Sequence, residues 1–349
     1  MKIELTPNRF IGDGFRPYIM AEVGINHNGE FEKAKLMIEE AARTGADAVK
    51  FQKRTLNEMY TKAYLSTPYV KENSFGSTYG SHKEFLEFSD DELLELKSIA
   101  DYNNITFSVS GFDFSGFEFI ENVLKVPFHK IASPLVTHYP LLKYVASFKK
   151  PMIISTGMHD YEEVSDMIKF VKSINKQIVL LQCTTSYPTE DSDVNLRVIE
   201  RYKKDFDVLA GYSSHDRGVV LPAASIVLGS CFIEKHFTFD RMAKGPDHIS
   251  SVETRGLDLI IKYANSVFYG LGSNEKNLCK SEIENKIKHG YSCVAFSNIS
   301  RGSVLTEEML SYKQPGGGIL PKDIESILGR RLNIDVQIDH KFSLDDFQE

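Results

Sequence analysis

The chain has 349 residues, of which 42% are hydrophobic and 26% charged, a composition typical of a soluble globular protein with one large domain and one small one. Its 41 basic and 48 acidic residues give a net charge of −7, and no Lys/Arg cluster stands out, so nucleic acid is disfavoured as a partner. No apolar run approaches the length of a membrane span, and Met1–Pro7 lacks the apolar core of a signal peptide, so we expect no membrane association.

The cysteines indicate a reducing compartment. None of the 4 cysteines belongs to a Cys-x-x-Cys pair, which argues against a structural zinc site. Cys183 and Cys231 lie inside apolar runs, where buried thiols are expected. We therefore expect a cytoplasmic protein.

From Tyr18 onward, short apolar runs alternate with amphipathic helical patterns. The predicted strands are Tyr18–Ile25, Ala48–Gln52, Thr106–Ser110, Phe128–Ile131, Met152–Ser155, Ile178–Cys183, Phe206–Gly211 and Cys231–His236. The predicted helices are Glu32–Thr44, Asp90–Tyr102, Gly116–Leu124, Tyr139–Phe148, Tyr161–Ile174, Asn195–Lys203, Arg217–Leu228 and Thr254–Leu271. Buried parallel strands read as continuous apolar runs, so this alternation predicts an α/β fold, a (β/α)8 TIM barrel. A doubly wound sheet is the main alternative.

The pattern divides the chain into three parts. We expect a catalytic barrel over residues 1–272, a polar linker over 273–288 and a small domain over 289–349. A domain of that size has little core of its own, so docking onto a larger surface is expected. The connection Lys53–Ser89 is much longer than an ordinary βα loop, and we interpret it as a loop that covers a substrate.

Two histidines close the last two predicted βα units. His215 follows the seventh strand and His236 ends the eighth, so both lie at the carboxyl end of the barrel, where chemistry takes place in this fold. Neutral imidazole is a common ligand of divalent metals, and water or substrate oxygens would complete the shell. Such an open site polarises a carbonyl as a Lewis acid. The alternative is that one histidine only hydrogen-bonds to substrate.

We expect two lysines and several hydroxyls at the same carboxyl end of the barrel. Lys50 and Lys130 project from apolar strands, where an unpaired ammonium is costly. We favour an anion site, in which nearby hydroxyls complete a phosphate or carboxylate cradle, over lysines that extend to solvent. These hydroxyls belong to Ser110, Ser133, Ser155 and Ser213.

Two carboxylates are further candidates for the site. Glu22 ends the first strand and is positioned for sugar binding or proton transfer, unless it pairs with a lysine. Asp247, after the eighth strand, either binds a polyol or is a turn residue. A metal, an anion cradle and polyol-binding carboxylates together favour carbon–carbon bond formation between an anionic three-carbon donor and a sugar aldehyde.

Ordered motifs from about residue 18 to the C-terminus resemble the sialic acid synthase family, whose members make nonulosonic acids. The matching segments are Glu22–Gly29, Ala48–Gln52, Lys130–Ser133, Ser155–Met158, Cys183–Pro188, Gly211–His215 and Glu234–Thr238. The last domain resembles the antifreeze-like SAF domain, which in this family reaches across a homodimer to the partner's active site. The resemblance therefore implies a domain-swapped homodimer.

The resemblance also implies a reaction, in which phosphoenolpyruvate, an N-acetylated hexose such as N-acetylmannosamine and water give a nine-carbon 2-keto acid and phosphate. It assigns a divalent metal, Mn2+ or Mg2+, to His215 and His236, and proton transfer to Glu22. It places Lys50, Ser110, Lys130, Ser133, Ser155 and Ser213 around phosphoenolpyruvate, and Gln52, Tyr187 and Asp247 near the amino sugar.

Three positions depart from the family pattern. Leu135 stands where members often carry a carboxylate, Ser214 replaces the aspartate of a Ser-Asp-His motif, and Gln314 replaces the arginine that crosses the dimer. That arginine is associated with the amide end of the acceptor, so a modified hexose is the alternative to N-acetylmannosamine.

Two other functions remain open. One is a phosphoenolpyruvate aldolase with another sugar, although the sequence has no Arg cluster for a phosphorylated acceptor. The other is a catalytically weak sugar-binding protein that retains the fold.

Overall fold

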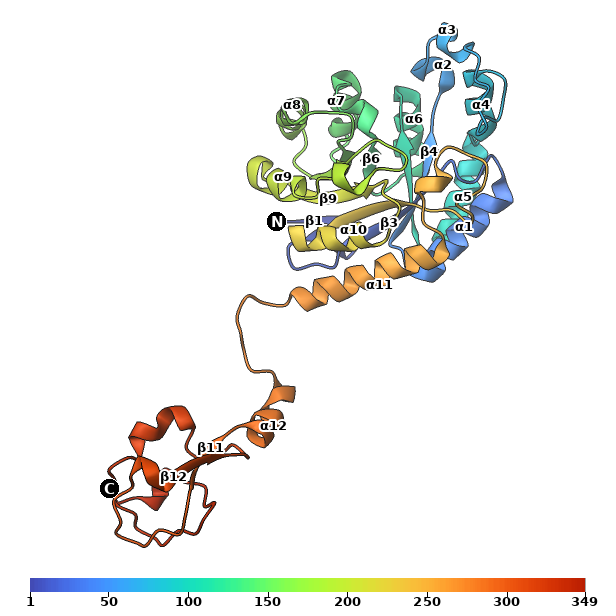
Figure 1. Cartoon of the computed structure of the whole chain (residues 1–349). Coiled ribbons are helices and arrows are strands. Elements are labelled where there is room, and N and C mark those ends of the chain that lie inside the picture. Colours follow the sequence, from blue (N-terminus) through green and yellow to red (C-terminus); the bar gives the residue numbers. More distant parts are fainter. Residues whose placement is uncertain (349) are drawn as a thin grey trace. The chain divides into compact units, whose positions relative to one another are not determined.

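The computed structural model describes residues 1–348 (Figure 1). The chain divides into two compact units, Met1–Gly272 and Ser273–Glu349. No helix within 1–348 is both long enough and apolar enough to cross a membrane.

The first unit is a closed barrel of eight parallel strands, which confirms the predicted (β/α)8 fold and excludes the doubly wound sheet (Figure 1). The strands are β3 (Tyr18–Gly24), β4 (Ala48–Lys53), β5 (Thr106–Gly111), β6 (His129–Ile131), β7 (Met152–Ser155), β8 (Ile178–Cys183), β9 (Leu209–Ser214) and β10 (Phe232–His236). Neighbours in sequence pair in parallel, and β10 returns to pair with β3. That last pairing closes the barrel and places the first and last strands side by side.

Helices cover the outside of the barrel. They are α1 (Phe31–Thr44), α5 (Asp90–Tyr102), α6 (Phe114–Phe119), α7 (Tyr139–Ser147), α8 (Tyr161–Lys172), α9 (Val198–Phe206), α10 (Val220–Ala224) and α11 (Thr254–Leu271). Helix α8 shows why these segments are helical. Asp160 caps its first turn by accepting a hydrogen bond from the Glu163 backbone N–H, and an i, i+3, i+4, i+7 stripe from Val164 to Val171 is buried.

Some boundaries differ from the sequence prediction. The seventh strand is Leu209–Ser214, not Phe206–Gly211, because α9 continues to Phe206 and ends only where Asp207 adopts a left-handed conformation, φ 48°. The predicted helix Gly116–Leu124 begins earlier, at Phe114, because Asp113 is its N-cap, and its last turn is a π-turn. The helix predicted from Arg217 begins at Val220 and tightens into a 3-10 turn over Ser225–Leu228.

An N-terminal hairpin, absent from the prediction, covers the amino end of the barrel. Strands β1 (Lys2–Thr6) and β2 (Arg9–Gly12) pair antiparallel. Their apolar residues Ile3, Leu5 and Ile11 are buried in one cluster with inward side chains of the barrel strands, including Phe128 and Phe232. This end of the barrel is therefore filled, which leaves the carboxyl end for a site.

The long connection after β4 folds into three short helices, α2 (Leu56–Met59), α3 (Lys62–Leu65) and α4 (Tyr79–Leu86). Aromatic rings hold it together, since Tyr79 contacts Tyr60, Tyr64 and Tyr69 at centroid distances of 4.6–5.4 Å. The connection is thus an ordered structure beyond the carboxyl end of β4 (Figure 1).

The second unit contains helix α12 (Lys280–His289) and strands β11 (Ser292–Ala295) and β12 (Leu310–Lys313), which pair antiparallel. Helix α12 occupies part of the segment interpreted as a linker. A separate hydrophobic core of this unit includes Cys293, Leu305, Leu332 and Phe342.

Candidate active site

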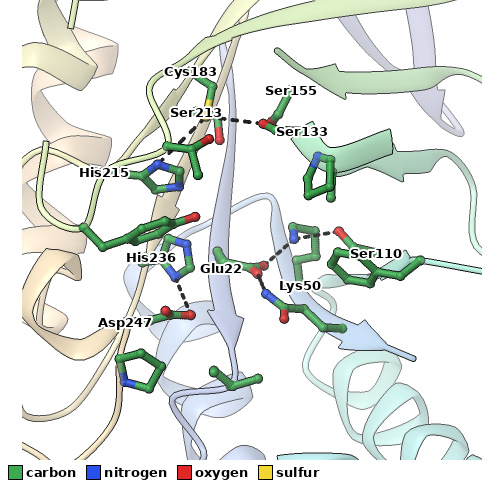
Figure 2. Close-up of a pocket in the computed structure, with 18 of the residues that line it drawn as sticks. Glu22, Lys50, Ser110, Ser133, Ser155, Cys183, Ser213, His215, His236 and Asp247 are labelled. Carbon is green, nitrogen blue, oxygen red and sulfur yellow. Dashed lines mark hydrogen bonds and ion pairs between the residues drawn. The ribbon is translucent and has the colours of Figure 1, made fainter. Parts of the chain in front are cut away.

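A cavity of about 320 Å³ opens at the carboxyl ends of the barrel strands. Every residue that the sequence singled out for a site lines it, from Glu22 on β3 to Asp247 after β10. The set is Glu22, Lys50, Gln52, Ser110, Lys130, Ser133, Ser155, Tyr187, Ser213, His215, His236 and Asp247. In Figure 2 the histidines and Asp247 form one wall, and Lys50 and Ser110 form the other, with Glu22 between them.

Strand register explains this convergence. Across β3 and β4, Glu22 lies beside Lys50, and across β5 and β6, Ser110 lies beside Lys130. The closing pair brings His236 of β10 beside Glu22 of β3. Because side chains alternate between the two faces of a strand, these register pairs place a ring of polar groups in one layer of the barrel.

The two lysines are buried and hydrogen-bonded to hydroxyls. Lys50 Nζ donates to Ser110 Oγ at 2.9 Å, and Lys130 Nζ donates to Ser155 Oγ at 2.8 Å. Lys50 and Lys130 are each only 2% exposed. Burial lowers the pKa of the Lys130 ammonium, and Glu234 opposes that shift. Two desolvated cations with adjacent hydroxyls form a cradle suited to a small anion.

A carboxylate that sequence reasoning missed, Glu234, sits between these lysines. Its Oε2 is 3.4 Å from Lys130 Nζ, and its Oε1 is 3.9 Å from Lys50 Nζ. Glu234 stands two residues before His236 on β10, so strand periodicity alone points both side chains to the same face. That spacing was the signal that could have identified it.

The two buried carboxyls differ in proton affinity. Burial raises the pKa of Glu22, and Glu234 adds to the rise while Lys50, at 2.7 Å, opposes it. The pKa of Glu234 is lowered, because Lys130 and Lys50 together outweigh the effect of burial. Neighbouring carboxyls with pKa values driven apart are suited to opposite roles, one as an acid and one as a base.

The histidine rings face one another, with centroids 5.3 Å apart. His215 Nδ1 lies 2.8 Å from the Thr184 carbonyl oxygen, which can only accept a hydrogen bond, so Nδ1 carries a proton and Nε2 is the nitrogen left for a metal. His236 is 5% exposed, its Nδ1 has no hydrogen-bond partner within 1–348, and burial lowers its pKa well below the ordinary value. A free lone pair and a backbone-anchored ring are what a metal site needs.

The remaining ligands of such a metal would come from oxygen. No group of three or more His, Cys, Asp or Glu side chains in the described part of the chain has the arrangement of a metal site. Asp247 Oδ2 is 3.9 Å from His236 Nδ1. Burial lowers the pKa of His215, but Cys183, the Thr184 carbonyl and Glu234 together raise it above the ordinary value, so a metal would compete with a proton for this ring.

Serine hydroxyls complete the cradle. Ser133 Oγ accepts a hydrogen bond from the Gly157 backbone N–H at 3.0 Å, and Ser213 Oγ donates to Glu234 Oε1 at 3.4 Å. Residue 157 has to be glycine, because a Cβ there would collide with Thr185 Oγ1. The close approach lets the Gly157 N–H hold the Ser133 hydroxyl in place.

The residues predicted to bind the sugar also line the cavity. Gln52 Nε2 donates to Glu22 Oε1 at 2.8 Å, and the Tyr187 ring lies 4.2 Å from the His215 ring. The long connection after β4 adds lining residues that the sequence did not single out. They are Arg54, Tyr69, Tyr79, His82 and Lys83.

The three residues that depart from the family pattern lie in different surroundings. Leu135 is 4% exposed and belongs to the hydrophobic core, so it does not line the cavity. Ser214 joins a buried network, in which Lys235 Nζ donates to its hydroxyl at 2.9 Å. The Gln314 amide donates to the His289 carbonyl oxygen at 2.8 Å within the second unit.

Comparison with known proteins identifies the family. A model described as the NeuB family matches residues 37–276, and one described as the SAF domain matches 292–347. The chain belongs to the NeuB family. The resemblance to sialic acid synthases and the predicted SAF domain are thereby confirmed.

NeuB-family relatives match nearly the whole chain. N-acetylneuraminate-9-phosphate synthase of Homo sapiens is 38% identical over 342 residues, covering 97% of this chain and 95% of that protein. N,N'-diacetyllegionaminic acid synthase of Legionella pneumophila is 34% identical over 331 residues, with 93% of each covered. The N-acetylneuraminic acid synthetase of Leptospira borgpetersenii, solved in complex with citrate, has 30% identity and a TM-score of 0.71, covering 82% of this chain and 95% of that one. The protein is therefore a member of the sialic and nonulosonic acid synthases.

Proposed function

We propose that the protein condenses phosphoenolpyruvate with an N-acetylated hexose and water, giving a nine-carbon 2-keto sugar acid and phosphate. The observation that carries this proposal is the buried pair of Lys50 and Lys130, each bonded to a serine hydroxyl, in the same cavity as His215 and His236. The cradle suits the anionic donor, and the histidine side suits the sugar carbonyl.

The donor occupies the lysine cradle in this proposal. Its phosphate and carboxylate are neutralised by Lys50 and Lys130, and hydroxyls of the cradle hold their oxygens. The hydroxyl groups are those of Ser110, Ser133, Ser155 and Ser213. Lys50 already pairs with Glu22 and Lys130 with Glu234, so each ammonium has a carboxylate partner before the donor arrives.

The carbon–carbon bond forms when C3 of phosphoenolpyruvate attacks the aldehyde carbon. Water then adds to C2, and the tetrahedral carbon expels phosphate by cleavage of its C–O bond. Glu22, with a raised pKa, donates the proton that the aldehyde oxygen takes up. Glu234, with a lowered pKa, accepts the proton that the water loses.

A divalent ion, Mn2+ or Mg2+, held by His215 and His236 would supply Lewis-acid polarisation of the aldehyde. Gln52, Tyr187 and Asp247 bind the sugar in this proposal, since their amide, phenol and carboxylate groups line the same cavity as the histidines. Gln314 stands where the family pattern has the arginine associated with the amide end of the acceptor, so a modified N-acetylhexosamine is the alternative to N-acetylmannosamine.

The proposal extends to assembly and location. We infer a homodimer in which the SAF domain, residues 292–347, reaches the partner's site. We also infer a cytoplasmic enzyme, because all four cysteines are free thiols, including the buried Cys183, Cys231 and Cys293.

A panel of N-acetylhexosamines tests the reaction. Phosphate release from phosphoenolpyruvate should require both an acceptor from the panel and added Mn2+. With phosphoenolpyruvate carrying ¹⁸O at its C2–O–P bridge, the label should leave in phosphate. Sugar binding in a calorimeter without release of phosphate from any acceptor would instead support a sugar-binding protein.

A further inference from the structure

The loop between β10 and α11 carries Asp247, to which the proposed reaction assigns acceptor binding. Asp247 Oδ2 lies 3.9 Å from His236 Nδ1, and the two side chains face each other in Figure 2. The Asp247 carboxylate makes no hydrogen bond within residues 1–348, so its oxygens are available to a ligand hydroxyl. Its place in the cavity therefore depends on how the backbone at residue 247 is held.

Backbone hydrogen bonds close the base of this loop. The Val252 N–H donates to the His236 carbonyl oxygen at 2.8 Å, and the Thr238 N–H donates to the Val252 carbonyl oxygen at 3.0 Å. Between these bonds the chain forms a short 3-10 turn, His248–Ser250, and otherwise consists of turns and bends. With so little regular structure, side-chain hydrogen bonds have to fix the conformation of the loop.

Asn26, just after β3, supplies the first of these hydrogen bonds. Its Nδ2 donates to the Phe237 carbonyl oxygen at 2.9 Å and to Ser251 Oγ at 2.8 Å. Ser251 Oγ in turn donates to the Asp247 carbonyl oxygen at 2.7 Å. Asn26 and Ser251 are each 1% exposed. Because a buried polar group that loses its partner is costly, this chain of hydrogen bonds holds the backbone at Asp247.

Asn28 ties down the part of the loop that precedes Asp247. Its Nδ2 donates to the Lys244 carbonyl oxygen at 2.9 Å, and its Oδ1 lies 3.2 Å from His248 Nε2. Asn26 and Asn28 both belong to the segment Glu22–Gly29, which matches a family motif, and the proposed condensation gives neither a role. The two asparagines thus anchor the loop on both sides of Asp247.

We propose that Asn26 and Ser251 are positioning residues for acceptor binding, and that they act through Asp247. This inference rests on the proposed condensation and adds the groups that hold its acceptor-binding carboxylate in place. Neither Asn26 nor Ser251 lines the cavity. An effect of either residue on the acceptor therefore has to pass through the loop that carries Asp247.

Steady-state kinetics of Ser251→Ala in the full-length protein tests the inference. With the N-acetylhexosamine that the wild type uses best, KM for the acceptor should rise by about tenfold, as expected for loss of one hydrogen bond. KM for phosphoenolpyruvate should stay at the wild-type value, because Ser110 and Ser155 hold the lysine cradle independently. Asn26→Leu removes both donors of the amide and should shift the acceptor KM in the same direction.

A double-mutant cycle separates positioning from a general loss of structure. Asp247→Ala removes the carboxylate and should lower kcat/KM for the acceptor. If Ser251 acts through Asp247, adding Ser251→Ala to Asp247→Ala should change kcat/KM by less than about twofold. A further fall as large as that of the single change Ser251→Ala would show that Ser251 acts independently of Asp247, and would overturn the inference while leaving the condensation intact.

Ser225→Ala is the matched control. Ser225 is fully buried, and its Oγ donates to the Pro222 carbonyl oxygen at 2.7 Å, but it does not line the cavity. Both KM values should therefore stay at the wild-type level. An equal rise of the acceptor and phosphoenolpyruvate KM values in Ser251→Ala would contradict the inference.

Calorimetry separates the inference from the reaction. If no acceptor is turned over, the proposed function fails, and binding of N-acetylmannosamine and of its 6-phosphate to the wild-type protein and to Ser251→Ala still tests the positioning role. Weaker binding of either sugar by the variant supports it. Identical binding by the two proteins, or no binding by the wild type, overturns it.

Discussion

At the scale of single residues, neighbouring groups of the same type acquire different properties from their contacts. Glu22 and Glu234 are both buried, but Glu234 lies between two lysines, whereas Glu22 has one close lysine and the second carboxylate beside it. The same holds for the histidines, since His215 has a backbone partner and His236 Nδ1 has none within the described residues. These differences support distinct roles in proton transfer and metal binding.

The histidine pair gives a residue-scale prediction. His215→Ala and His236→Ala should each abolish metal-stimulated turnover and weaken Mn2+ binding by more than about 100-fold, because loss of even an outer-shell partner costs up to about that factor. Equilibrium dialysis with Mn2+ measures binding independently of turnover. The exposed His289 lies outside the cavity, so His289→Ala should bind Mn2+ like the wild type. Wild-type binding in either cavity variant would remove the metal assignment.

His129 predicts how stability depends on pH. This side chain is fully buried against Phe117 and Phe148, and burial lowers its pKa to about 4, although Glu121 at 3.0 Å opposes the shift. In the unfolded chain the His129 pKa is near 6.5, so the unfolded state binds the proton more readily than the folded state. The contribution of neutral His129 to the free energy of unfolding is therefore complete above about pH 6.5 and is lost as the pH falls towards 4. The loss is roughly 3 kcal/mol.

Urea unfolding of the wild type and His129→Leu at pH 7.5 and pH 5 measures this contribution. The wild type should lose more unfolding free energy between the two pH values than the variant does. Equal losses would show that His129 does not titrate in this way.

At the scale of elements, β9 and β10 are joined by a buried polar network behind the histidines. Lys235 Nζ donates to Ser214 Oγ and to the Asp216 carbonyl oxygen, and the Asp216 carboxylate accepts a hydrogen bond from the Tyr212 hydroxyl at 2.7 Å. Lys235 is fully buried, and its Nζ lies 3.8 Å from Asp216 Oδ1. In this chain Asp216 thus supplies a carboxylate near the position where Ser214 replaces the family's aspartate.

Removal of one partner should therefore destabilise the barrel. Lys235→Met leaves the Asp216 carboxylate buried without its cation, at a cost of about 3–5 kcal/mol in unfolding free energy. Because the penalty comes from the remaining charge, Lys235→Met combined with Asp216→Asn should cost less than the sum of the two single changes. Additive costs in denaturant titrations would show that the two groups do not interact.

Most barrel strands were predictable because they contain apolar runs buried on both faces, as β8 is throughout Ile178–Cys183. The N-terminal hairpin was missed because its two strands are short and only alternate residues, such as Ile3 and Leu5, are buried. The seventh strand was misplaced because Phe206 is apolar but closes helix α9. Apolar character reports burial, and it does not distinguish the end of a helix from the start of a strand.

The cavity lysines, serines and histidines could be located from sequence because each lies at or just after the carboxyl end of a predicted strand. His236 ends β10 and therefore meets Glu22 on β3 once the barrel closes. Arg54 and Lys83 could not be located in the same way, since their approach depends on how the connection between β4 and α5 packs. Contacts among aromatic residues such as Tyr60 and Tyr79 decide that packing, and no periodic pattern records them.

At the scale of the whole molecule, the second unit has its own small core and matches the SAF domain. The inferred exchange of this domain between subunits predicts a homodimer. Light scattering at micromolar concentration should give twice the 39.5 kDa chain mass. A monomer at that concentration would contradict the exchanged arrangement and leave the barrel chemistry to a single subunit.

The central claim is that this cavity joins phosphoenolpyruvate to an amino-sugar aldehyde. Mass detection of the product from phosphoenolpyruvate, Mn2+ and a panel of N-acetylhexosamines with and without a 6-phosphate tests it most directly. The account predicts a nine-carbon 2-keto acid, formed with one phosphate per product and lost in Lys130→Met. Wild-type protein that binds Mn2+ and phosphoenolpyruvate yet yields no such acid from any acceptor would contradict it.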